Sequence, residues 1–390
     1  AMTELLRHRG PDEGGLLDRG PLAVLGHRRL SIIDLAQGQQ PMGSGDGSVW
    51  ITYNGEIYNH RALRADLETR GHRFRTSCDT EVVLEAYREW GDACPERLEG
   101  MFAFAVLDLA KRRLFLARDH LGKKPLYLRW RRGVLDFASE VSALCCAADW
   151  RGDLDPVAWS FYLHLGYIPS PWTAYRDTTK LRPGEACVVD ASGLRRWRYW
   201  SVAARAPLAA ERPEDLLEPL EEALREAVGA RLMSEVPLGA FLSGGIDSGL
   251  VVSLMARLCG PGVKTASIGF DGEPGGGELE AARLVAERNA TDHDEFVVRA
   301  DAAGILEAVM RHFGEPFADS SAIPTWYVSR ETRRRVTVSL SGDGGDEAFG
   351  GYDFRYFPHR RDARLRRALP AALRRPVASV LAGLWPRHRS

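Results

Sequence analysis

A short glycine-rich segment between two apolar stretches limits the folds that are open to this chain. It reads Phe-Leu-Ser-Gly-Gly-Ile-Asp-Ser over residues 241–248, after VPLGAFL and at the start of IDSGLVVSLMARL. The first stretch predicts a buried strand and the second a helix. Glycines allow a tight turn, so that backbone N–H groups converge at the positive end of the helix dipole. The sequence therefore predicts an anion cradle, in which Asp247 orients the loop or holds Mg²⁺.

A second loop of small and acidic residues follows a strand further along the chain. The apolar run 336–340 predicts the strand, and Ser341-Gly342-Asp343-Gly344-Gly345-Asp346-Glu347 comes directly after it. Ligands of parallel sheets bind at the carboxyl ends of the strands, and clustered carboxylates are costly unless a cation or an amine pairs with them. We therefore expect this loop to share a ligand site with residues 241–248. Ile268 lies beside the same edge and contacts either a nucleotide base or the core.

The two halves of the chain have different patterns. Residues 215–232 have helical spacing, and strands predicted over 236–242, 263–270, 293–298 and 336–340 are separated by helical stretches. Such alternation predicts a parallel sheet with helices on both faces. The first half instead has short apolar segments that predict strands over 22–35, 49–59, 101–110, 112–119, 125–130 and 134–140.

Few helices are expected among the strands of the first half, which indicates an α+β domain of layered sheets. One helix is predicted over residues 79–90, with Asp79 or Thr80 as its N-cap. Between the halves, residues 202–213 are rich in Ala, Arg and Pro, which predicts a linker.

Composition excludes several classes of protein. The formal net charge is -1, whereas nucleic-acid-binding proteins carry a large positive excess. No apolar run approaches the roughly 18 residues of a membrane span, and no secretory signal is evident. The six cysteines form no CxxC pair and no zinc-ligand spacing, which indicates reduced thiols in a cytoplasmic protein. The Arg-rich stretch after residue 354 predicts solvated helices, with an anionic partner as the alternative.

The two loops, in this order, resemble the synthetase domain of asparagine synthetase B. The first lacks the GK[ST] ending of a Walker A loop and resembles the PP-loop of ATP pyrophosphatases, which split ATP between the α and β phosphates. The resemblance implies that Asp343, where asparagine synthetases have Glu, supports formation of an acyl-adenylate. It implies that the pyrophosphate end of ATP is bound by Ser243, Gly244, Gly245, Asp247 and Ser248, and that the nucleotide is lined by Leu242, Ile268, Ser341 and Gly342.

Four motifs of the first half resemble the class II glutamine amidotransferase domain. They are Arg29-Leu30-Ser31-Ile32-Ile33, Asn54-Gly55-Glu56-Ile57-Tyr58-Asn59, Ser77-Cys78-Asp79-Thr80-Glu81 and Arg118-Asp119-His120-Leu121-Gly122.

The resemblance implies a glutamine pocket built from these motifs. Arg29 would pair with the α-carboxylate of glutamine, and Asp79 and Glu56 would hold its α-ammonium group. The Asn54 amide and the Gly55 N–H would form an oxyanion hole for a tetrahedral intermediate. The rest of the first motif, Leu30, Ser31, Ile32 and Ile33, would complete the pocket.

The resemblance covers nearly the whole chain and implies two domains. Residues 1–200 are expected to form an α+β layered N-terminal nucleophile domain of the class II glutamine amidotransferase type, without its nucleophile segment. Residues 201–213 are the expected linker. Residues 214–390 are expected to form an α/β parallel-sheet PP-loop ATP pyrophosphatase domain of the asparagine synthase type, incomplete at its C-terminus.

The expected nucleophile is not in the sequence. In this family glutamine is cut by an N-terminal cysteine whose own α-amine serves as the base. The sequence begins Ala1-Met2-Thr3, and no internal cysteine has a free α-amine. We therefore expect residues 1–390 not to hydrolyse glutamine. The family's synthetase domain also continues beyond Ser390, so we expect this chain to be a fragment of a longer product.

The implied function is ATP-dependent amidation of a carboxylate, with ammonia from glutamine, giving an amide, AMP and pyrophosphate. ATP and Mg²⁺ are the expected cofactors, aspartate is the default acceptor, and a cytoplasmic homodimer without nucleic-acid or membrane partners is expected. The alternatives are an amidotransferase of exosortase and exopolysaccharide systems with another acceptor, a ring-closing ligase similar to β-lactam synthetase, a non-catalytic nucleotide-binding scaffold, and a tRNA-modifying enzyme.

Overall fold

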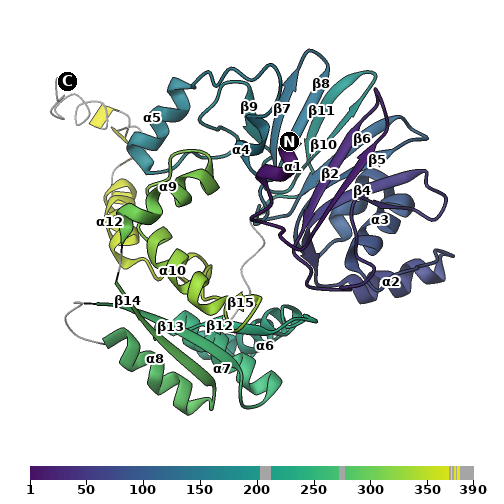
Figure 1. Cartoon of the computed structure of the whole chain (residues 1–390). Helices are drawn as coiled ribbons and strands as arrows, with labels where there is room; N and C mark the ends of the chain where they lie inside the picture. The colour runs from purple at the N-terminus through teal and green to yellow at the C-terminus, as the bar shows by residue number, and fades with distance from the viewer. Residues whose placement is uncertain are drawn as a thin grey trace.

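The structure is a computed structural model that describes residues 1–202, 212–271, 277–299 and 301–368, with residues 370, 373, 374, 376 and 377. Its N-terminal part is built mainly from antiparallel strands, and its C-terminal part alternates strands and helices (Figure 1). Most of the expected linker, residues 203–211, lies outside the described residues.

A six-stranded antiparallel sheet forms the centre of the N-terminal part, with the order β11-β10-β6-β5-β4-β3. Its strands are β3 (Met42–Gly43), β4 (Val49–Ile57), β5 (Gly100–Asp108), β6 (Arg113–Arg118), β10 (Glu185–Asp190) and β11 (Gly193–Arg198). Two smaller antiparallel sheets accompany it. One pairs β1 (Glu13–Asp18) with β2 (Val24–Arg29), and the other has the order β8 (Val134–Ala138), β7 (Tyr127–Arg131), β9 (Thr178–Lys180).

The side chains of β5 alternate between two cores because successive residues of a strand point to opposite faces. Phe102 and Phe104 belong to the core that includes α3 (Asp79–Trp90) and α2 (His60–Thr69). Ala103 and Ala105 belong to the opposite core, which includes residues of β6 and β7. The continuous apolar run of this strand is therefore buried on both faces, and its small alanines leave space on the second face.

Two sequence predictions in this part need correction. The helix predicted over 79–90 is confirmed, but its N-cap is Cys78, because the Asp79 carboxylate accepts hydrogen bonds from the Tyr53 hydroxyl at 2.7 Å and the Ile57 N–H at 3.1 Å. The strand predicted over 22–35 ends at Arg29, and residues 30–35 form a loop. Helix α2 and strands β1, β10 and β11 were not predicted.

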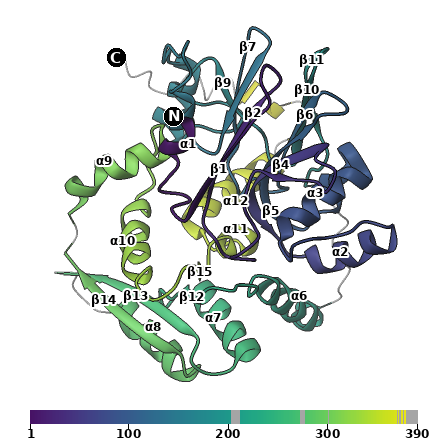
Figure 2. The same ribbon diagram turned by 45° about the vertical axis from the view of Figure 1, so that its right-hand side comes forward.

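The C-terminal part contains a four-stranded parallel sheet with the order β14-β13-β12-β15. Its strands are β12 (Leu238–Phe241), β13 (Lys264–Phe270), β14 (Asp292–Val298) and β15 (Val338–Leu340). Helices α6 (Leu217–Ala230), α7 (Ile246–Cys259) and α8 (Gly277–Arg288) share one core with the sheet. Helices α9 (Ala302–Phe313) and α10 (Ala322–Thr332) share another. Figure 2 shows α7 and α8 on one side of the sheet and α10 on the other, which confirms the predicted arrangement.

The end of α9 packs against the N-terminal part. The His312 ring stacks on His8 with centroids 4.4 Å apart, and the Glu315 carboxylate accepts a hydrogen bond from the Ala174 N–H at 3.2 Å. Glu315 also forms an ion pair with Lys180. The remaining helical elements are α1 (Met2–Leu5), η1 (Gly91–Arg97), α4 (Val141–Leu144), α5 (Pro156–Leu165), η2 (Pro213–Leu216), α11 (Gly345–Phe349) and α12 (Asp353–Ala368).

Helix α12 carries the Arg-rich stretch, and those of its side chains that the structure describes are exposed, as predicted. Within the described ranges, no helix combines the length and apolar character that crossing a membrane requires.

Candidate active site

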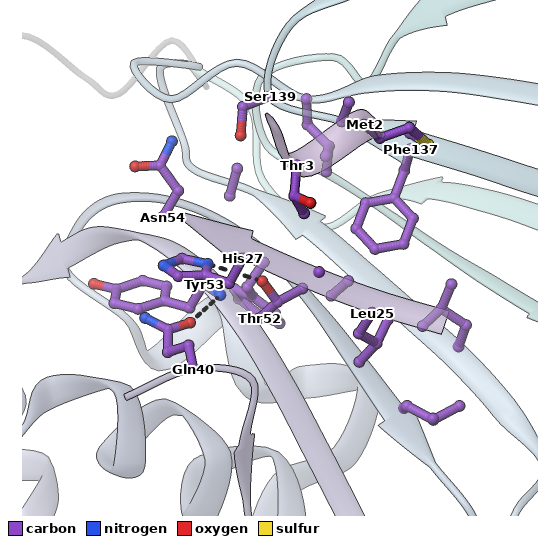
Figure 3. A pocket seen from close by; sticks show the side chains of 18 of the residues that line it. Met2, Thr3, Leu25, His27, Gln40, Thr52, Tyr53, Asn54, Phe137 and Ser139 are labelled. Atoms are coloured by element: carbon purple, nitrogen blue, oxygen red, sulfur yellow. Dashed lines mark hydrogen bonds between the residues drawn. The ribbon is translucent and has the colours of Figure 1, made fainter. Parts of the chain in front are cut away.

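A cavity of about 1920 Å³ lies on the alanine-bearing face of the six-stranded sheet. Its lining comes from β2, β4, β5 and β8 and from the first residues of the chain. Figure 3 shows Met2, Thr3 and Phe137 on one side of this space and Thr52, Tyr53 and Asn54 on another. The lining includes most of the residues that the sequence assigned to glutamine: Arg29, Leu30, Ile32, Ile33, Asn54, Gly55, Glu56 and Asp79. Ser31 is not part of the lining, and its N–H donates to Asp12 at 2.9 Å.

Asn54 and Gly55 lie near the end of β4, where the strand passes close to β5. Asn54 pairs with Ala103 and Gly55 pairs with Phe102. A Cβ at position 55 would lie 2.3 Å from the Met101 carbonyl oxygen, so only glycine fits there. Figure 3 shows the Asn54 amide pointing into the cavity, and no hydrogen bond from the described residues engages it. The amide is therefore free to bind an oxyanion.

Glu56 and Asp79 form an acidic corner of the cavity. Burial raises the pKa of Glu56 to about 7, and the negative charge of Asp79 adds to this rise. One oxygen of Glu56, Oε1, is buried and has no hydrogen-bond partner among the described residues. Burial also raises the pKa of Asp79, against the hydrogen bonds from Tyr53 and Ile57 that stabilise its charged form. An unpaired buried carboxylate of this kind suits an ammonium ligand.

The Arg29 side chain holds the loop of residues 30–35 by hydrogen bonds to its carbonyl oxygens. Its side chain is 6% exposed. Its Nη2 group donates to the carbonyl oxygens of Ile33 at 3.0 Å and Asp34 at 2.7 Å, and its Nη1 group donates to Glu13 at 3.1 Å. Asp34 has a φ of 50°, a left-handed conformation that turns the chain back toward the guanidinium group. Arg29 lines the cavity, but its Nη groups are already engaged by protein oxygens.

The segment over residues 241–248 forms a compact loop between β12 and α7. The Ser248 hydroxyl lies 3.0 Å from that of Ser243 and accepts the Ser243 N–H at 3.2 Å. Gly244 has a φ of 79°, and a Cβ there would lie 2.7 Å from the Glu278 carbonyl oxygen of α8. Gly245 is the N-cap of α7. The predicted strand–loop–helix geometry is therefore present, with hydroxyl and N–H groups at the N-terminus of the helix.

The second acidic loop packs directly on the first. A Cβ on Gly342 would lie 2.7 Å from the Ser248 N, and a Cβ on Gly345 would lie 2.3 Å from Asp247 Cγ. Because the parallel strands β12 and β15 are neighbours, the two loops meet at the carboxyl edge of the sheet. Asp343 is exposed beside them, and one of its carboxylate oxygens accepts from the Ser341 hydroxyl at 2.9 Å.

Two other residues assigned to the nucleotide have mainly packing roles here. Leu242 is buried in the core of α6, α7 and α8. Ile268 packs against Ile305, Val309 and Tyr327 on the other face of the sheet, which is the core alternative for this residue.

The donor set fits a magnesium ion that is bound mainly by nucleotide phosphates. Such an ion needs only one or two protein carboxylates. Within the described residues, no group of three or more His, Cys, Asp or Glu side chains could hold a metal on its own. Asp247 offers one carboxylate beside the loop, which is sufficient for an ion that arrives with ATP.

Several residues near the cavity were not singled out from the sequence. The Asp34 carboxylate ties the loop of residues 30–35 to Ser77 at the start of α3. Tyr53 fixes Asp79 through its hydroxyl. Burial, together with the charge of Arg29, lowers the pKa of His27 to about 4, and its ring lies 3.0 Å from the Thr52 hydroxyl. Only the position of Asp34 directly after the first motif was a signal in the sequence.

Cys78 is the one cysteine among the lining residues of the cavity. Burial raises the pKa of its thiol to about 12, and the charge of Asp79 contributes to the rise. A thiol that stays protonated at neutral pH is a poor nucleophile. The structure therefore gives Cys78 no nucleophilic role.

The glutamine amidotransferase domain family matches residues 1–200, and the asparagine synthase family matches residues 219–389. The chain is 35% identical over 384 residues to asparagine synthetase (glutamine-hydrolyzing) 1 of Bacillus subtilis, covering 98% of this chain and 59% of that protein. It is 35% identical over 399 residues to a Methanocaldococcus jannaschii protein provisionally named asparagine synthetase (glutamine-hydrolyzing) 2, covering 96% of this chain and 75% of that one.

A plant relative gives a similar result. The asparagine synthetase (glutamine-hydrolyzing) of Zea mays is 35% identical over 365 residues, covering 90% of this chain and 56% of that protein. The chain thus spans a little over half of the length of this relative and of the Bacillus one.

Proposed function

This chain belongs to the family of glutamine-hydrolysing asparagine synthetases, and from that premise we propose that it is a glutamine-dependent amide ligase. It activates a carboxylate with ATP as an acyl-adenylate and amidates it with ammonia taken from glutamine. The observation that carries the proposal is the contact of the two loops, where Gly342 and Gly345 pack on Ser248 and Asp247 at the carboxyl edge of a parallel sheet. One site of this kind can hold both pyrophosphate and the activated carboxylate.

In the N-terminal domain, which we take as residues 1–200, the cavity holds glutamine. Glu56 and Asp79 pair with the α-ammonium group. The α-carboxylate of glutamine displaces Glu13 from Arg29 and pairs with the guanidinium group. The Asn54 amide and the Gly55 N–H bind the oxyanion. The free Asn54 amide and the unpaired Glu56 oxygen favour a working glutamine pocket over the ring-closing alternative, which needs none.

The nucleophile that cuts glutamine is known here only from the family resemblance. The resemblance assigns cleavage of glutamine to an amino-terminal cysteine. Cys78 lines the cavity, but its buried thiol is unsuited to the role. We propose that glutamine binds in this cavity and that Cys78 is not the group that cuts it.

In the C-terminal domain, which we take as residues 214–390, the loop 242–248 holds the pyrophosphate end of ATP. A carboxylate oxygen of the acceptor attacks the α-phosphorus, and pyrophosphate leaves toward the N–H groups at the start of α7. Asp343 supports this step from the second loop. Ammonia then attacks the acyl carbon, and AMP leaves with the bridging oxygen. Mg²⁺, when bound beside Asp247, supplies charge neutralisation for the phosphates.

Aspartate is the proposed acceptor, in a homodimeric cytoplasmic enzyme. The cytoplasmic location is supported by the six cysteines, all of which are free. The aspartate assignment rests on the names of the relatives and on the acidic second loop, whose carboxylates suit the amine of an amino-acid acceptor.

The test is acceptor-dependent exchange of labelled pyrophosphate into ATP by the purified protein. Exchange that requires aspartate supports acyl-adenylate formation and aspartate as the acceptor. Exchange that requires a different carboxylate would retain the ligase and replace the acceptor. A protein that binds ATP tightly but exchanges no pyrophosphate with any carboxylate would be the non-catalytic alternative.

A further inference from the structure

A short segment of the C-terminal domain reaches the glutamine pocket of the N-terminal domain. Residues 231–237, here called the connector, join the end of α6 to the start of β12. The Pro237 carbonyl oxygen accepts the Thr337 N–H at 2.9 Å, which fixes the end of the connector to the strand β15 side of the sheet. Two other residues of the connector, Arg231 and Glu235, contact residues that line the cavity or lie close to lining residues in the sequence.

Glu235 makes two hydrogen bonds to the loop of residues 30–35. Its N–H donates to the Ile32 carbonyl oxygen at 3.1 Å, and its Oε1 atom accepts the Asp34 N–H at 3.1 Å. Backbone and side chain of one residue thus hold two positions of the loop. An ionised acceptor makes the second bond stronger than a neutral pair.

This contact is linked to the proposed substrate-binding carboxylate Asp79 through one hydrogen-bonded residue, Ser77. Asp34 accepts the Ser77 N–H at 2.8 Å through Oδ2, and Asp79 follows two residues later at the start of α3. Arg29 donates to the Asp34 carbonyl oxygen. Asp34 is therefore held by the connector, by Arg29 and by Ser77 just before α3, so we expect a shift at Glu235 to affect both ends of the glutamine pocket.

Arg231 brings a positive charge to the same pocket. Its guanidinium carbon lies 4.6 Å from the centre of the Tyr58 ring, and Nη1 donates to the Ala227 carbonyl oxygen at 2.5 Å. Tyr58 follows Glu56 by two residues on the same segment. The charged and titratable groups that face Glu56 include Asp79 from α3, Tyr53 from β4, Tyr58 just after β4, Lys124 from the segment before β7, and Arg231 from the connector.

We propose that Arg231 and Glu235 are positioning residues that complete the glutamine pocket from the second domain, Glu235 by holding the loop of residues 30–35 and Arg231 by setting the charge around Glu56. The inference rests on the proposed function, since it assumes that this cavity holds glutamine. Neither residue contacts the substrate itself.

The Arg231 contribution has a characteristic pH dependence. Burial raises the pKa of Glu56 to about 7, while the charges of Lys124 and Arg231 act in the opposite direction. Only the ionised carboxylate attracts the α-ammonium group of glutamine, so binding weakens as the pH falls below the pKa of Glu56. Without Arg231 this pKa is higher, and the loss of affinity therefore begins at a higher pH.

The first experiment is calorimetric binding of L-glutamine to the full chain between pH 6 and pH 8, with Arg231→Gln. We expect the pH midpoint of binding to rise by about half a pH unit or more, so that the variant is several-fold weaker at pH 6 and nearly unchanged at pH 8. Arg231→Lys restores the charge and is expected to restore the midpoint. Arg225→Gln is the matched control, because Arg225 lies on α6 and, among the described residues, pairs with the exposed Glu222.

The second experiment compares Glu235→Ala with Glu235→Gln at pH 8. Glu235→Ala lacks the acceptor for the Asp34 N–H and is expected to bind free glutamine about tenfold more weakly. Glu235→Gln keeps an acceptor oxygen and is expected to recover most of the affinity. Glu221→Ala removes an exposed α6 carboxylate that pairs with Arg257 and is the control. ATP binding and the thermal midpoint report whether each variant is folded.

The outcomes separate this inference from the proposed function. Unaltered protein that binds no glutamine would overturn the glutamine site and the inference with it. Unaltered protein that binds glutamine, with Arg231→Gln and Glu235→Ala matching it at every pH, would overturn the inference alone. An equal loss at all pH values for Arg231→Gln would assign that residue to folding and not to the charge around Glu56.

Discussion

The carboxylate of Asp34 accepts both the backbone N–H and the hydroxyl of Ser77, at 2.8 and 3.0 Å. This pair joins the loop of residues 30–35 to the residue that precedes the N-cap of α3, although Asp34 and Ser77 lie 43 residues apart in the sequence. Each segment carries part of the glutamine pocket, Arg29 on one side and Asp79 on the other. The shape of the pocket therefore depends on a residue that needs no contact with the substrate.

Asp34→Ala should weaken glutamine binding by at least tenfold and destabilise the fold by about 1–3 kcal/mol, because the N–H groups of Ser77 and Gln37 lose their acceptor. Calorimetry with glutamine and chemical unfolding measure the two effects. Asp46→Ala is the control. Asp46 also accepts hydrogen bonds from nearby serines, Ser44 and Ser48, but it lies in the turn between β3 and β4 and is not a lining residue of the cavity. Equal glutamine affinity in the unaltered protein and Asp34→Ala would contradict this role.

Glu13→Gln should strengthen glutamine binding by several-fold. Glu13 occupies the Arg29 Nη1 group at 3.1 Å, and the α-carboxylate of glutamine competes with it for that group. A neutral amide competes less well than a carboxylate and repels the substrate less. Glu13→Asp retains the charge and should leave affinity nearly unchanged. Weaker binding by Glu13→Gln would show that this carboxylate supports the pocket.

Gly244→Ala should abolish ATP binding while the chain remains folded. The residue has a φ of 79°, and a Cβ would meet the Glu278 carbonyl oxygen and the Ala281 Cβ at 2.7 and 2.8 Å. The loop must therefore move away from α8. Gly262→Ala is the control, because Gly262 has a φ of 86° but no heavy atom within 4 Å of an added Cβ. The control should cost about 1 kcal/mol of stability and bind ATP normally. Normal ATP binding by Gly244→Ala would exclude this loop as the phosphate site.

Arg129→Ala should destabilise the fold by about 1–3 kcal/mol, since it removes a buried guanidinium group that donates to three partly exposed carboxylates. The Arg129 side chain is 1% exposed and pairs with Asp136, Asp149 and Asp177 at 2.9, 2.6 and 2.8 Å. Arg131→Ala removes a more exposed arginine that pairs with Asp149 at 3.3 Å, and it should cost less than about 1 kcal/mol. Similar unfolding midpoints in urea for the two variants would contradict the buried network.

The sequence predicted those features that depend on local periodicity. The parallel sheet followed from alternating apolar strands and helices, and α3 was placed over its full range because its apolar pattern is helical from end to end. The loop over residues 241–248 followed from its glycines and from the stretches on either side of it. Each of these signals is contained within a few consecutive residues.

Features that depend on distant contacts were not predictable in this way. The N-cap of α3 was wrong because Tyr53, on another element, engages the Asp79 carboxylate. The strand expected to continue past Arg29 ends there because Asp34 turns back with a positive φ toward the guanidinium group. Nothing in the sequence distinguishes Glu235 from other acidic residues, and only the fold places it beside Asp34.

The most direct test of the proposed chemistry follows the oxygen of the acceptor. The purified protein is incubated with ATP, Mg²⁺, an ammonium salt and aspartate labelled with oxygen-18 in its side-chain carboxylate, and the products are analysed by mass spectrometry. Ammonium replaces glutamine, so the result does not depend on the glutamine site. Acyl-adenylate chemistry predicts AMP that carries one labelled oxygen, together with pyrophosphate and asparagine. Label in inorganic phosphate with ADP as the second product, or AMP without label, would contradict the account.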